Sequence, residues 1–344
     1  MHIHLIWPEA NNLPTGNRET ALQYIAVFKA LGHEVTTRPG NFENIKSADS
    51  GSKLAGSIDV GTWQDPECPF PRCDVLVVLH GLRCRNELIA YRKQVPTGRI
   101  LLVLTGTDLY AEEELMPELE DSLAMADQVV VLQEQAAWRV PLAYRDKVNV
   151  IYQSVKFMPK RSQLRKYEFV ISVVGHLREE KDPFRTAEAS RKLPESSRIQ
   201  VQHVGAILDA AFEAQVDREA EQNSRYTYRG ALDPEKTRQV IADSDLLVHT
   251  SLVEGGSRVV GEAVVAGTPV LATRIDAHLS IFGAGYPGLF EVGDTEGLME
   301  LLCKAESDSA FYRDLVDRCG QVVGQFDPEI ENAAWEKLLD SVQK

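Results

Sequence analysis

Long apolar runs are missing from this chain of 344 residues. The longest ones, such as residues 74–80 and 100–104, are far shorter than the roughly 20 residues that cross a bilayer as a helix. The opening residues, Met-His-Ile-His-Leu-Ile-Trp-Pro-Glu, have neither a basic stretch nor a long apolar stretch, unlike a secretory signal peptide. These absences predict a cytoplasmic protein that does not bind a membrane.

Cysteine is scarce, and its placement argues against a disulfide framework and against a zinc site. The five cysteines are scattered along the chain at Cys68, Cys73, Cys84, Cys303 and Cys319. No second pair joins Cys68 and Cys73 at a spacing typical of zinc ligands, and the total is odd. We therefore expect reduced thiols, as in a cytosolic protein.

An excess of positive charge is also missing, since the formal net charge is −14. This acidity argues against general binding to nucleic acids or anionic membranes. It does not argue against a diphosphate ligand, because salt screens charges beyond about 8 Å and a few local cations outweigh dispersed surface charge. The content of 44% hydrophobic and 26% charged residues is that of a soluble globular protein, and the length allows two domains.

What the sequence does contain is two similar halves in which short apolar segments alternate with helical ones. We expect strands at residues 3–7, 34–37, 75–79, 100–104, 128–132, 148–151, 169–174, 199–204, 226–229, 246–248 and 270–272. We expect helices at residues 18–31, 86–95, 112–126, 184–192, 210–222, 234–242, 259–266, 295–305, 309–325 and 328–342. The alternation predicts an α/β fold with a doubly wound parallel sheet in each half. Residues 40–66 form an irregular excursion with one short strand near Ile58, and the polar, basic residues 153–166 form the linker.

Residues 246–273 carry the strongest functional signal. A short buried strand leads into Gly255-Gly256-Ser257, and a helix follows, with Glu254 and Glu262 separated by seven residues. The glycines allow close approach of a ligand, and the helix start offers unpaired N–H groups to a phosphate. The two carboxylates can accept hydrogen bonds from sugar and ribose hydroxyls, as a nucleotide-sugar requires. The alternative is an ordinary strand-to-helix turn with a capping glutamate, which the paired glutamates make less favourable.

A second loop, residues 175–183, follows the first strand of the second half and begins with Gly175-His176. At the carboxyl edge of a parallel sheet, Arg178 and Lys181 can neutralise a departing diphosphate. The alternative is a solvated charged loop. Asp243-Ser244-Asp245 imitates a metal motif, but it precedes a strand and therefore lies at the opposite edge. We predict no metal site.

In the first half, polar residues follow several strands and are expected to share one edge. They are Asn11, Asn12, Thr15, Gly16, Asn17 and Arg18, then His80 and Arg83, then Thr105, Gly106, Thr107 and Asp108, and finally Gln133, Gln153 and Ser154. One such residue is usually a turn or cap residue, but several converging loops favour an acceptor site. The edge has no obvious base except Asp108, which suits an acceptor that is already an anion.

The Glu254–Glu262 pattern resembles the donor site of retaining family 4 glycosyltransferases with the GT-B architecture. That resemblance implies two facing Rossmann-like domains, an acceptor-binding domain at residues 1–155 and a donor-binding domain at 156–325. It also implies that residues 326–344 form a helix that crosses back onto the N-terminal domain, with Trp335 as its anchor. Many family members have Arg where this chain has His176, which shifts the charge-balancing role to Arg178 and Lys181.

A more specific resemblance is to the selenosugar synthases of selenoneine biosynthesis. It is carried by residues 105–110, 130–133, 151–154, 175–185, 254–263 and 286–294. It implies transfer of a hexosyl group from a UDP-sugar (UDP-GlcNAc or UDP-glucose) to selenophosphate, with formation of a C–Se bond. Ser257-Arg258 stands where Ala-Asn is expected and Asp276-Ala277-His278 where a Gly-Asn pair is expected. We expect both segments on loops near the donor.

These resemblances assign a role to each candidate residue. Glu262 should hold the ribose, and Glu254 with the Gly255–Ser257 amides should hold the sugar hydroxyls and phosphate. Arg178, Lys181 and Arg258 should balance the diphosphate, while the acceptor anion should meet His80, Arg83, Asn12, Asn17, Arg18 and Thr105–Asp108. The UDP-sugar is a substrate, and no cofactor or metal is expected.

Three alternative functions stay open. One is a family 4 glycosyltransferase that uses a hydroxyl or thiol of a small soluble acceptor. A lipid acceptor is disfavoured, because the helix at 18–31 has only Arg18 and Lys29 as basic residues. The others are a nucleotide-sugar-binding protein without transferase activity and a nucleotide-sugar epimerase.

Overall fold

The computed structural model describes residues 1–8, 15–40, 70–159 and 167–343. The strand predicted near Ile58 and the side chains of Asn11 and Asn12 lie outside these residues. The chain separates into two compact units, which we call unit 1 (Met1–Ile151 with Asn332–Lys344) and unit 2 (Tyr152–Glu331). No helix among the described residues is long and apolar enough to span a bilayer.

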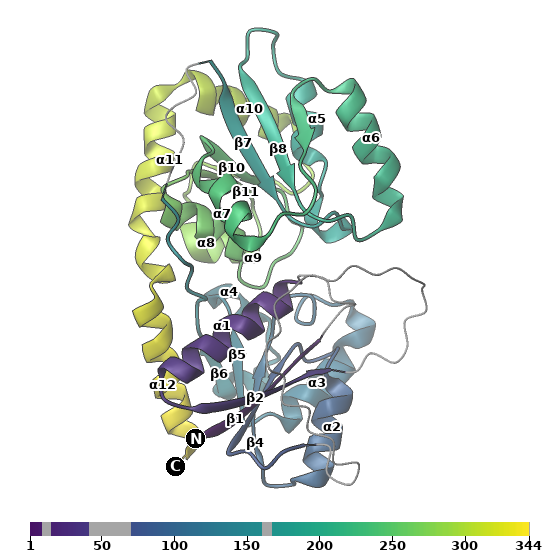
Figure 1. The fold of residues 1–344 in the computed structure, drawn as a ribbon, viewed down its shortest axis with the longest axis vertical. Coiled ribbons are helices and arrows are strands. Elements are labelled where there is room, and N and C mark those ends of the chain that lie inside the picture. The colour runs from purple at the N-terminus through teal and green to yellow at the C-terminus, as the bar shows by residue number, and fades with distance from the viewer. Residues whose placement is uncertain (9–14, 41–69, 160–166, 344) are drawn as a thin grey trace. The chain divides into compact units, whose positions relative to one another are not determined.

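Unit 1 contains a six-stranded parallel sheet in the order β2-β1-β3-β4-β5-β6 (Figure 1). Its strands are β1 (His2–Pro8), β2 (Glu34–Gly40), β3 (Val75–Leu79), β4 (Arg99–Val103), β5 (Gln128–Val131) and β6 (Val148–Val150). Its helices are α1 (Gly16–Ala30), α2 (Arg85–Gln94), α3 (Met116–Met125), α4 (Glu134–Arg139) and the greater part of α12 (Pro328–Gln343). All five residues of β3 are buried, as expected where both faces of a parallel sheet are covered.

The helix expected at 112–126 begins differently from its prediction. Glu113–Leu115 form a 3₁₀ turn, and α3 starts only at Met116, with Pro117 in its first turn. Proline is tolerated there because the first N–H groups of a helix have no intrahelical partner.

The last helix closes the core of unit 1. Trp335 of α12 is fully buried, and its ring lies edge-on to the rings of Tyr24 and Phe28 of α1, at centroid distances of 4.8 and 5.0 Å. Aromatic edge contacts of this kind add to the free energy gained by burial of the rings. Trp335 therefore anchors the C-terminal segment in unit 1.

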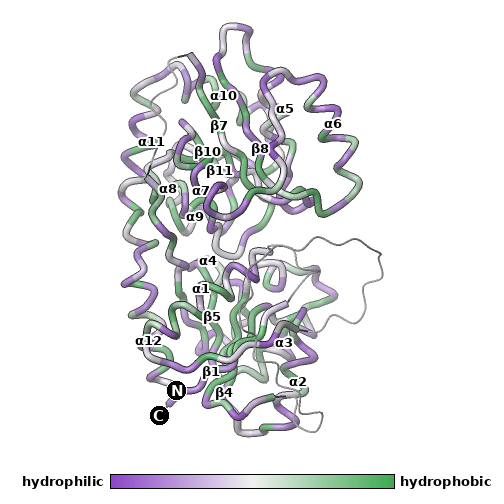
Figure 2. Tube along the Cα trace, in the orientation of Figure 1, coloured by the Kyte–Doolittle hydropathy of each residue, from purple (hydrophilic) through white to green (hydrophobic). Residues whose placement is uncertain are grey.

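Unit 2 repeats the pattern, with a six-stranded parallel sheet in the order β12-β11-β10-β7-β8-β9. Its strands are β7 (Phe169–Val174), β8 (Ile199–Val204), β9 (Tyr226–Tyr228), β10 (Leu246–His249), β11 (Val270–Thr273) and β12 (Leu289–Phe290). Its helices are α5 (Arg185–Arg191), α6 (Glu213–Gln222), α7 (Pro234–Ala242), α8 (Arg258–Ala266), α9 (Asp276–Phe282), α10 (Thr295–Ser307) and α11 (Ser309–Gln321). Figure 2 shows the central strands of each sheet coloured as hydrophobic. The predicted α/β fold with two doubly wound parallel sheets is confirmed.

Two details of unit 2 differ from the prediction. Asp276, Ala277 and His278, expected on a loop, form the first turn of α9, and His278 is fully buried. The helix expected at 309–325 ends at Gln321 and is followed by a 3₁₀ turn, Val323–Phe326. The helix α9, of seven residues, was not predicted from the sequence.

Candidate functional site

The strand order of unit 2 reverses between β7 and β10, which are neighbours in the sheet. The chain winds in one direction from β7 to β9 and in the other from β10 to β12. In open α/β sheets, ligands bind in the crevice outside the carboxyl ends of the strands at such a switch point. The loops that leave β7 and β10 are residues 175–184 and 250–257, the two segments that the sequence singled out.

At this switch point the two loops are joined by an ion pair. Nζ of Lys181 contacts Oε1 of Glu254, and the same oxygen accepts a hydrogen bond from Ser251 Oγ at 2.7 Å. Nε2 of His249, the last residue of β10, lies 3.4 Å from it. The other carboxylate oxygen, Oε2, has no hydrogen-bond partner among the described residues. One oxygen of Glu254 is therefore held by protein groups and the other is available to a ligand.

The electrostatics of the pair keep Glu254 ionised. Burial acts to raise the pKa of Glu254, but the Lys181 ammonium, then His249, and the hydrogen bonds from Lys181 and Ser251 outweigh burial and lower the pKa to about 2. The carboxylate is thus an acceptor for hydroxyl groups at any physiological pH.

Backbone contacts hold the two loops together beside the ion pair. The Thr250 hydroxyl donates to the carbonyls of Lys181 and Asp182, both at 2.9 Å. The Leu252 N–H donates to the Glu180 carbonyl at 2.9 Å. These bonds fix the positions of the loops independently of the Lys181 and Glu254 side chains.

The turn before α8 is strained and carries an unpartnered hydroxyl. Ser257 adopts the left-handed conformation with φ 44°, and its buried Oγ has no hydrogen-bond partner among the described residues. In the described chain, the other non-glycine residues with positive φ are His80 and Asp182. All three lie in loops at the carboxyl edges of the sheets, and strain of this kind clusters at binding sites. The Ser257 hydroxyl and the start of α8 together offer donors to an anion.

Glu262 lies one turn into α8 and is 9% exposed. Its Oε1 is 3.5 Å from Arg258 Nε and 3.9 Å from an Nη atom of Arg238 on α7. Sequence reasoning missed Arg238, because nothing in the sequence places a residue of α7 beside α8.

The remaining predicted donor-site residues lie in the loop after β7. Arg178 pairs with Glu180 at 3.0 Å, so neither it nor Lys181 is an unpaired cation. The His176 side chain is bound to the neighbouring loop, since its Nδ1 accepts the Ala206 N–H at 3.0 Å. Gly175 lies beside the Lys181 side chain. A Cβ added at Gly175 would lie 3.8 Å from Cγ of Lys181.

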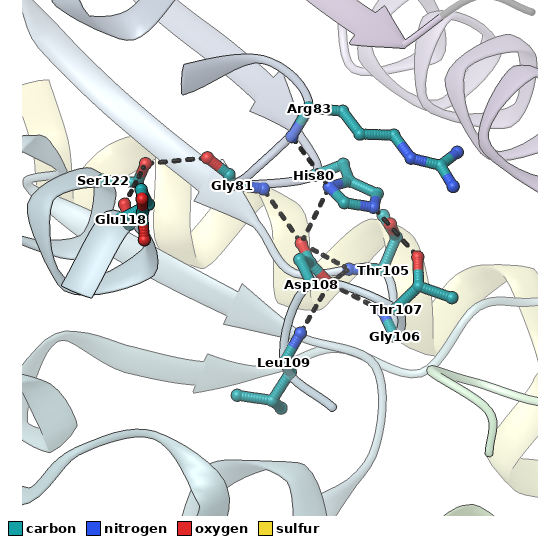
Figure 3. A network of polar contacts seen from close by, with 10 residues as sticks. All are labelled: His80, Gly81, Arg83, Thr105, Gly106, Thr107, Asp108, Leu109, Glu118 and Ser122. Atoms are coloured by element: carbon teal, nitrogen blue, oxygen red, sulfur yellow. Dashed lines mark hydrogen bonds and ion pairs between the residues drawn. The ribbon is translucent and has the colours of Figure 1, made fainter. Parts of the chain in front are cut away.

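In unit 1 the predicted acceptor residues build a polar network at the carboxyl ends of β3 and β4 (Figure 3). The fully buried Asp108 accepts N–H hydrogen bonds from Gly81, Thr105, Gly106 and Leu109 at 2.9–3.0 Å. A carboxylate with four backbone donors is engaged in holding its loop. Asp108 therefore stabilises the loop and is not free to act as a base.

His80 belongs to the same network. Its Nδ1 accepts the Arg83 N–H at 3.2 Å, so the neutral ring carries its proton on Nε2, which bonds Thr107 Oγ1 at 2.9 Å. Burial is the largest effect on the pKa of His80 and lowers it, Asp108 opposes this, and Arg83 adds to it. His80 is thus neutral and occupied at both nitrogens.

The cations at this edge differ in their surroundings. The Arg83 side chain is exposed and extends away from the network, with no partner for its guanidinium among the described residues (Figure 3). Arg18 lies in the first turn of α1, 3.9 Å from Glu19. Asn17 lies beside it, while Asn12 is outside the described residues.

The Asp243–Asp245 segment has a structural role. Asp245 Oδ2 accepts the Val170 N–H at 2.8 Å at the amino end of β7, and Asp243 caps α7. Within the described chain, no group of three or more His, Cys, Asp or Glu residues could hold a metal ion.

Solved structures match this chain over nearly its whole length. HepE of Anabaena in complex with UDP and glucose has a TM-score of 0.72 and 17% identity, covering 98% of this chain and 99% of HepE. The sucrose-phosphate synthase of Thermosynechococcus elongatus has a TM-score of 0.74 and 17% identity, covering 99% and 98%. The chain therefore has the predicted GT-B fold.

Two sequence comparisons add to the structural ones. The lipopolysaccharide core biosynthesis glycosyltransferase LpsE of Rhizobium meliloti (strain 1021) is 32% identical over 107 residues. This match covers 30% of the chain and only about a third, 32%, of the length of LpsE. The family model for glycosyl transferases group 1 matches residues 154–321. The residues that match this family model make up most of unit 2.

Proposed function

We propose that the chain is a glycosyltransferase that takes a hexosyl group from a UDP-sugar and transfers it to selenophosphate. The observation that carries the donor half is the convergence of Lys181, Glu254, Ser257 and Glu262 at one switch point. HepE, a structural neighbour, is known in complexes with UDP and with UDP-glucose. For this chain, UDP-GlcNAc and UDP-glucose are the donors to test.

The donor would occupy the carboxyl edge of the unit 2 sheet. Glu262 would accept hydrogen bonds from the ribose, and the start of α8 with the Gly255, Gly256 and Ser257 amides would face the diphosphate. Lys181, Arg178 and Arg258 would neutralise the charge that develops on the leaving diphosphate. The free Oε2 of Glu254 would accept a sugar hydroxyl.

The acceptor would bind at the carboxyl edge of the unit 1 sheet, near Arg83, Arg18, Asn17 and the Thr105–Thr107 backbone, with His80 holding Thr107. A selenium lone pair of selenophosphate would attack the anomeric carbon. A C–Se bond forms, the bond from that carbon to the diphosphate oxygen breaks, and the electron pair leaves on UDP. This step needs no base, because the attacking group is already an anion.

The state of Asp108 and His80 supports an anionic acceptor. Asp108 is saturated by backbone donors, and both nitrogens of His80 are engaged. Neither group is free to deprotonate a hydroxyl, which an alcohol acceptor would require near the transition state.

A second candidate is transfer to a hydroxyl or thiol of a small soluble acceptor. It is favoured by the similarity of 107 residues to LpsE, which is a lipopolysaccharide core biosynthesis glycosyltransferase. The two candidates share the donor site and differ only in the acceptor.

We further propose that transfer is independent of metal ions. The support is the role of Asp245, whose carboxylate is engaged at the amino edge of the sheet. Turnover should survive EDTA, and a large loss restored by Mn²⁺ or Mg²⁺ would contradict this proposal.

The decisive experiment is mass spectrometry after incubation with UDP-GlcNAc or UDP-glucose, with and without selenophosphate. We expect UDP release and a hexosyl selenophosphate only when both substrates are present. Transfer to sugar hydroxyls with no reaction of selenophosphate would support the second candidate instead. Conversion of the UDP-sugar without any transfer would indicate an epimerase.

A further inference from the structure

A buried pair of histidines, His249 at the end of β10 and His278 in α9, connects Glu254 to the backbone of β11. His249 is 4% exposed and His278 is 0% exposed. Nδ1 of His278 lies 2.6 Å from the Thr273 carbonyl oxygen, and its Nε2 lies 3.1 Å from Nδ1 of His249. Nε2 of His249 lies 3.4 Å from Glu254 Oε1. The three contacts form a chain that has an oxygen acceptor at each end.

This row of three contacts lacks one proton. Two neutral imidazoles carry one N–H each, which satisfies only two of the three contacts. The 2.6 Å contact places a proton on His278 Nδ1, so the neutral His278 accepts at Nε2 and His249 donates from Nδ1. His249 Nε2 then directs a lone pair at the Glu254 carboxylate. A third proton there would turn that contact into an imidazolium–carboxylate ion pair.

We propose that the His249–His278 pair positions Glu254 and takes up one proton when a nucleoside diphosphate draws Lys181 away from that carboxylate. The inference rests on the proposed donor site. In the structure, Lys181 satisfies Glu254, and a diphosphate at the switch point would compete for the same ammonium. A buried carboxylate left without a cation is costly, and an imidazolium at His249 replaces the cation while Oε2 stays available to the sugar.

The charges around the two histidines favour protonation of His249 once Lys181 is drawn away. Burial dominates the pKa of His249 and lowers it to about 3, with Glu254 opposing and His278 and Lys181 adding to the effect. Burial likewise lowers the pKa of His278 to about 4, opposed by the Thr273 carbonyl and Glu254 and assisted by Lys181. A further titratable group, His203, lines the same small cavity of about 10 Å³ as His249 and Lys181. Pairing of Lys181 with a diphosphate neutralises a positive charge that disfavours the imidazolium, so the pKa of His249 rises on binding.

Replacement of either histidine by glutamine separates this role from packing. An amide carries two N–H groups, so His249→Gln or His278→Gln supplies the missing donor without an added proton. Both variants keep polar groups between Thr273 and Glu254. His4→Gln, at a buried histidine of unit 1 whose pKa burial lowers to about 4, is the matched control.

The experiment is calorimetric titration with UDP in buffers of different ionisation enthalpy, which gives the number of protons taken up. The wild type and His4→Gln should take up as much as about one proton more per UDP than His249→Gln or His278→Gln. The ionisation of UDP itself cancels in this difference. UDP affinity should also rise more steeply in the wild type as the pH falls.

Two outcomes overturn the proposal in different ways. Equal proton uptake by the wild type and both glutamine variants, with UDP bound in each, would eliminate the proton-accepting role and leave the proposed function intact. No binding of UDP to the wild type would remove the donor site, and the inference with it. Imidazole ¹⁵N spectra with and without UDP provide a direct check, because His249 should acquire a proton on its second nitrogen only with UDP bound.

Discussion

Nζ of Lys181 contacts Oε1 of Glu254, although the two residues are 73 positions apart in the chain. Lys181 lies in the loop after β7 and Glu254 in the loop after β10, so the pair joins the two strands at which the sheet of unit 2 changes direction. Each of the two groups is proposed to contact a different part of the donor. A diphosphate that binds Lys181 would compete with this ion pair, so we expect donor binding to be sensitive to the charges around it.

Glu262→Ala should weaken UDP binding, because a carboxylate that accepts ribose hydroxyls is lost. The expected cost is roughly 1.5–3 kcal/mol. Calorimetry with UDP measures it, with thermal unfolding to show that the variant is folded. Asp314→Ala removes a carboxylate that pairs with Arg318 on α11 and should leave UDP affinity unchanged. Unchanged affinity in Glu262→Ala would remove this residue from the site.

The stability of unit 2 should fall as the pH drops below about 6.5. Burial lowers the pKa of His203, His249 and His278 from 6.5 to about 4, 3 and 4, so below pH 6.5 the unfolded chain binds more protons than the folded one. Each histidine contributes up to about 1.4 kcal/mol per pH unit in that window. The depressed pKa of Glu254 acts in the same direction, but only between about 4.5 and about 2.

Scanning calorimetry between pH 7.5 and 5 tests this expectation. The transition of unit 2 should shift more than that of unit 1, where His4 and His80 are the corresponding buried histidines. His249→Gln should flatten the dependence. Stability of unit 2 that stays constant or rises as the pH falls would show that these histidines are already protonated in the folded state.

The sheets could be predicted from the sequence because their strands are buried on both faces. The runs Val75–Leu79 and Leu246–His249 are almost entirely apolar, and Gly or polar residues mark their ends. The short helices α4 and α9, of six and seven residues, were not predicted, although α5, also of seven residues, was. A helix of two turns or fewer shows too little of its period to be identified by periodicity alone.

The candidate site, too, could be predicted only in part from the sequence. Loops at the carboxyl ends of strands follow from strand order, so the segments around Lys181, Glu254 and Asp108 could be selected. Their partners could not, because ion pairs and buried hydrogen bonds depend on tertiary contacts. His249 left one trace in the sequence, a polar residue that ends an apolar strand, but its partner His278 was expected on a loop.

Asp108→Asn should destabilise unit 1 by roughly 3 kcal/mol, because a buried carboxylate with four N–H donors becomes an amide whose NH₂ group faces donors. Urea unfolding measures the loss. Asp121→Asn is the control, since its side chain is 61% exposed and pairs with Arg85, and it should cost under about 1 kcal/mol. A stable Asp108→Asn protein that lost only catalysis would instead identify Asp108 as a base.

The last prediction concerns the acceptor. Arg83 extends from the loop after β3 with no partner among the described residues, and Arg18 lies at the start of α1, so both can meet an anion at the carboxyl edge of the unit 1 sheet. Arg83→Ala and Arg18→Ala should each raise the KM for selenophosphate about tenfold, the equivalent of one charge-assisted hydrogen bond. UDP affinity should stay nearly unchanged. Arg99→Ala, at the amino end of β4 and half exposed, is the control and should leave this KM unchanged.

The pH profile distinguishes the two acceptor classes. Selenophosphate needs no deprotonation by the protein, so the rate should be flat above the ionisation of the acceptor itself. A hydroxyl acceptor would show an additional ionisation that belongs to a protein base. A protein that glycosylates a sugar hydroxyl readily and ignores selenophosphate would refute the selenosugar proposal, and the effects of Arg83→Ala and Arg18→Ala would then have to be measured against that sugar.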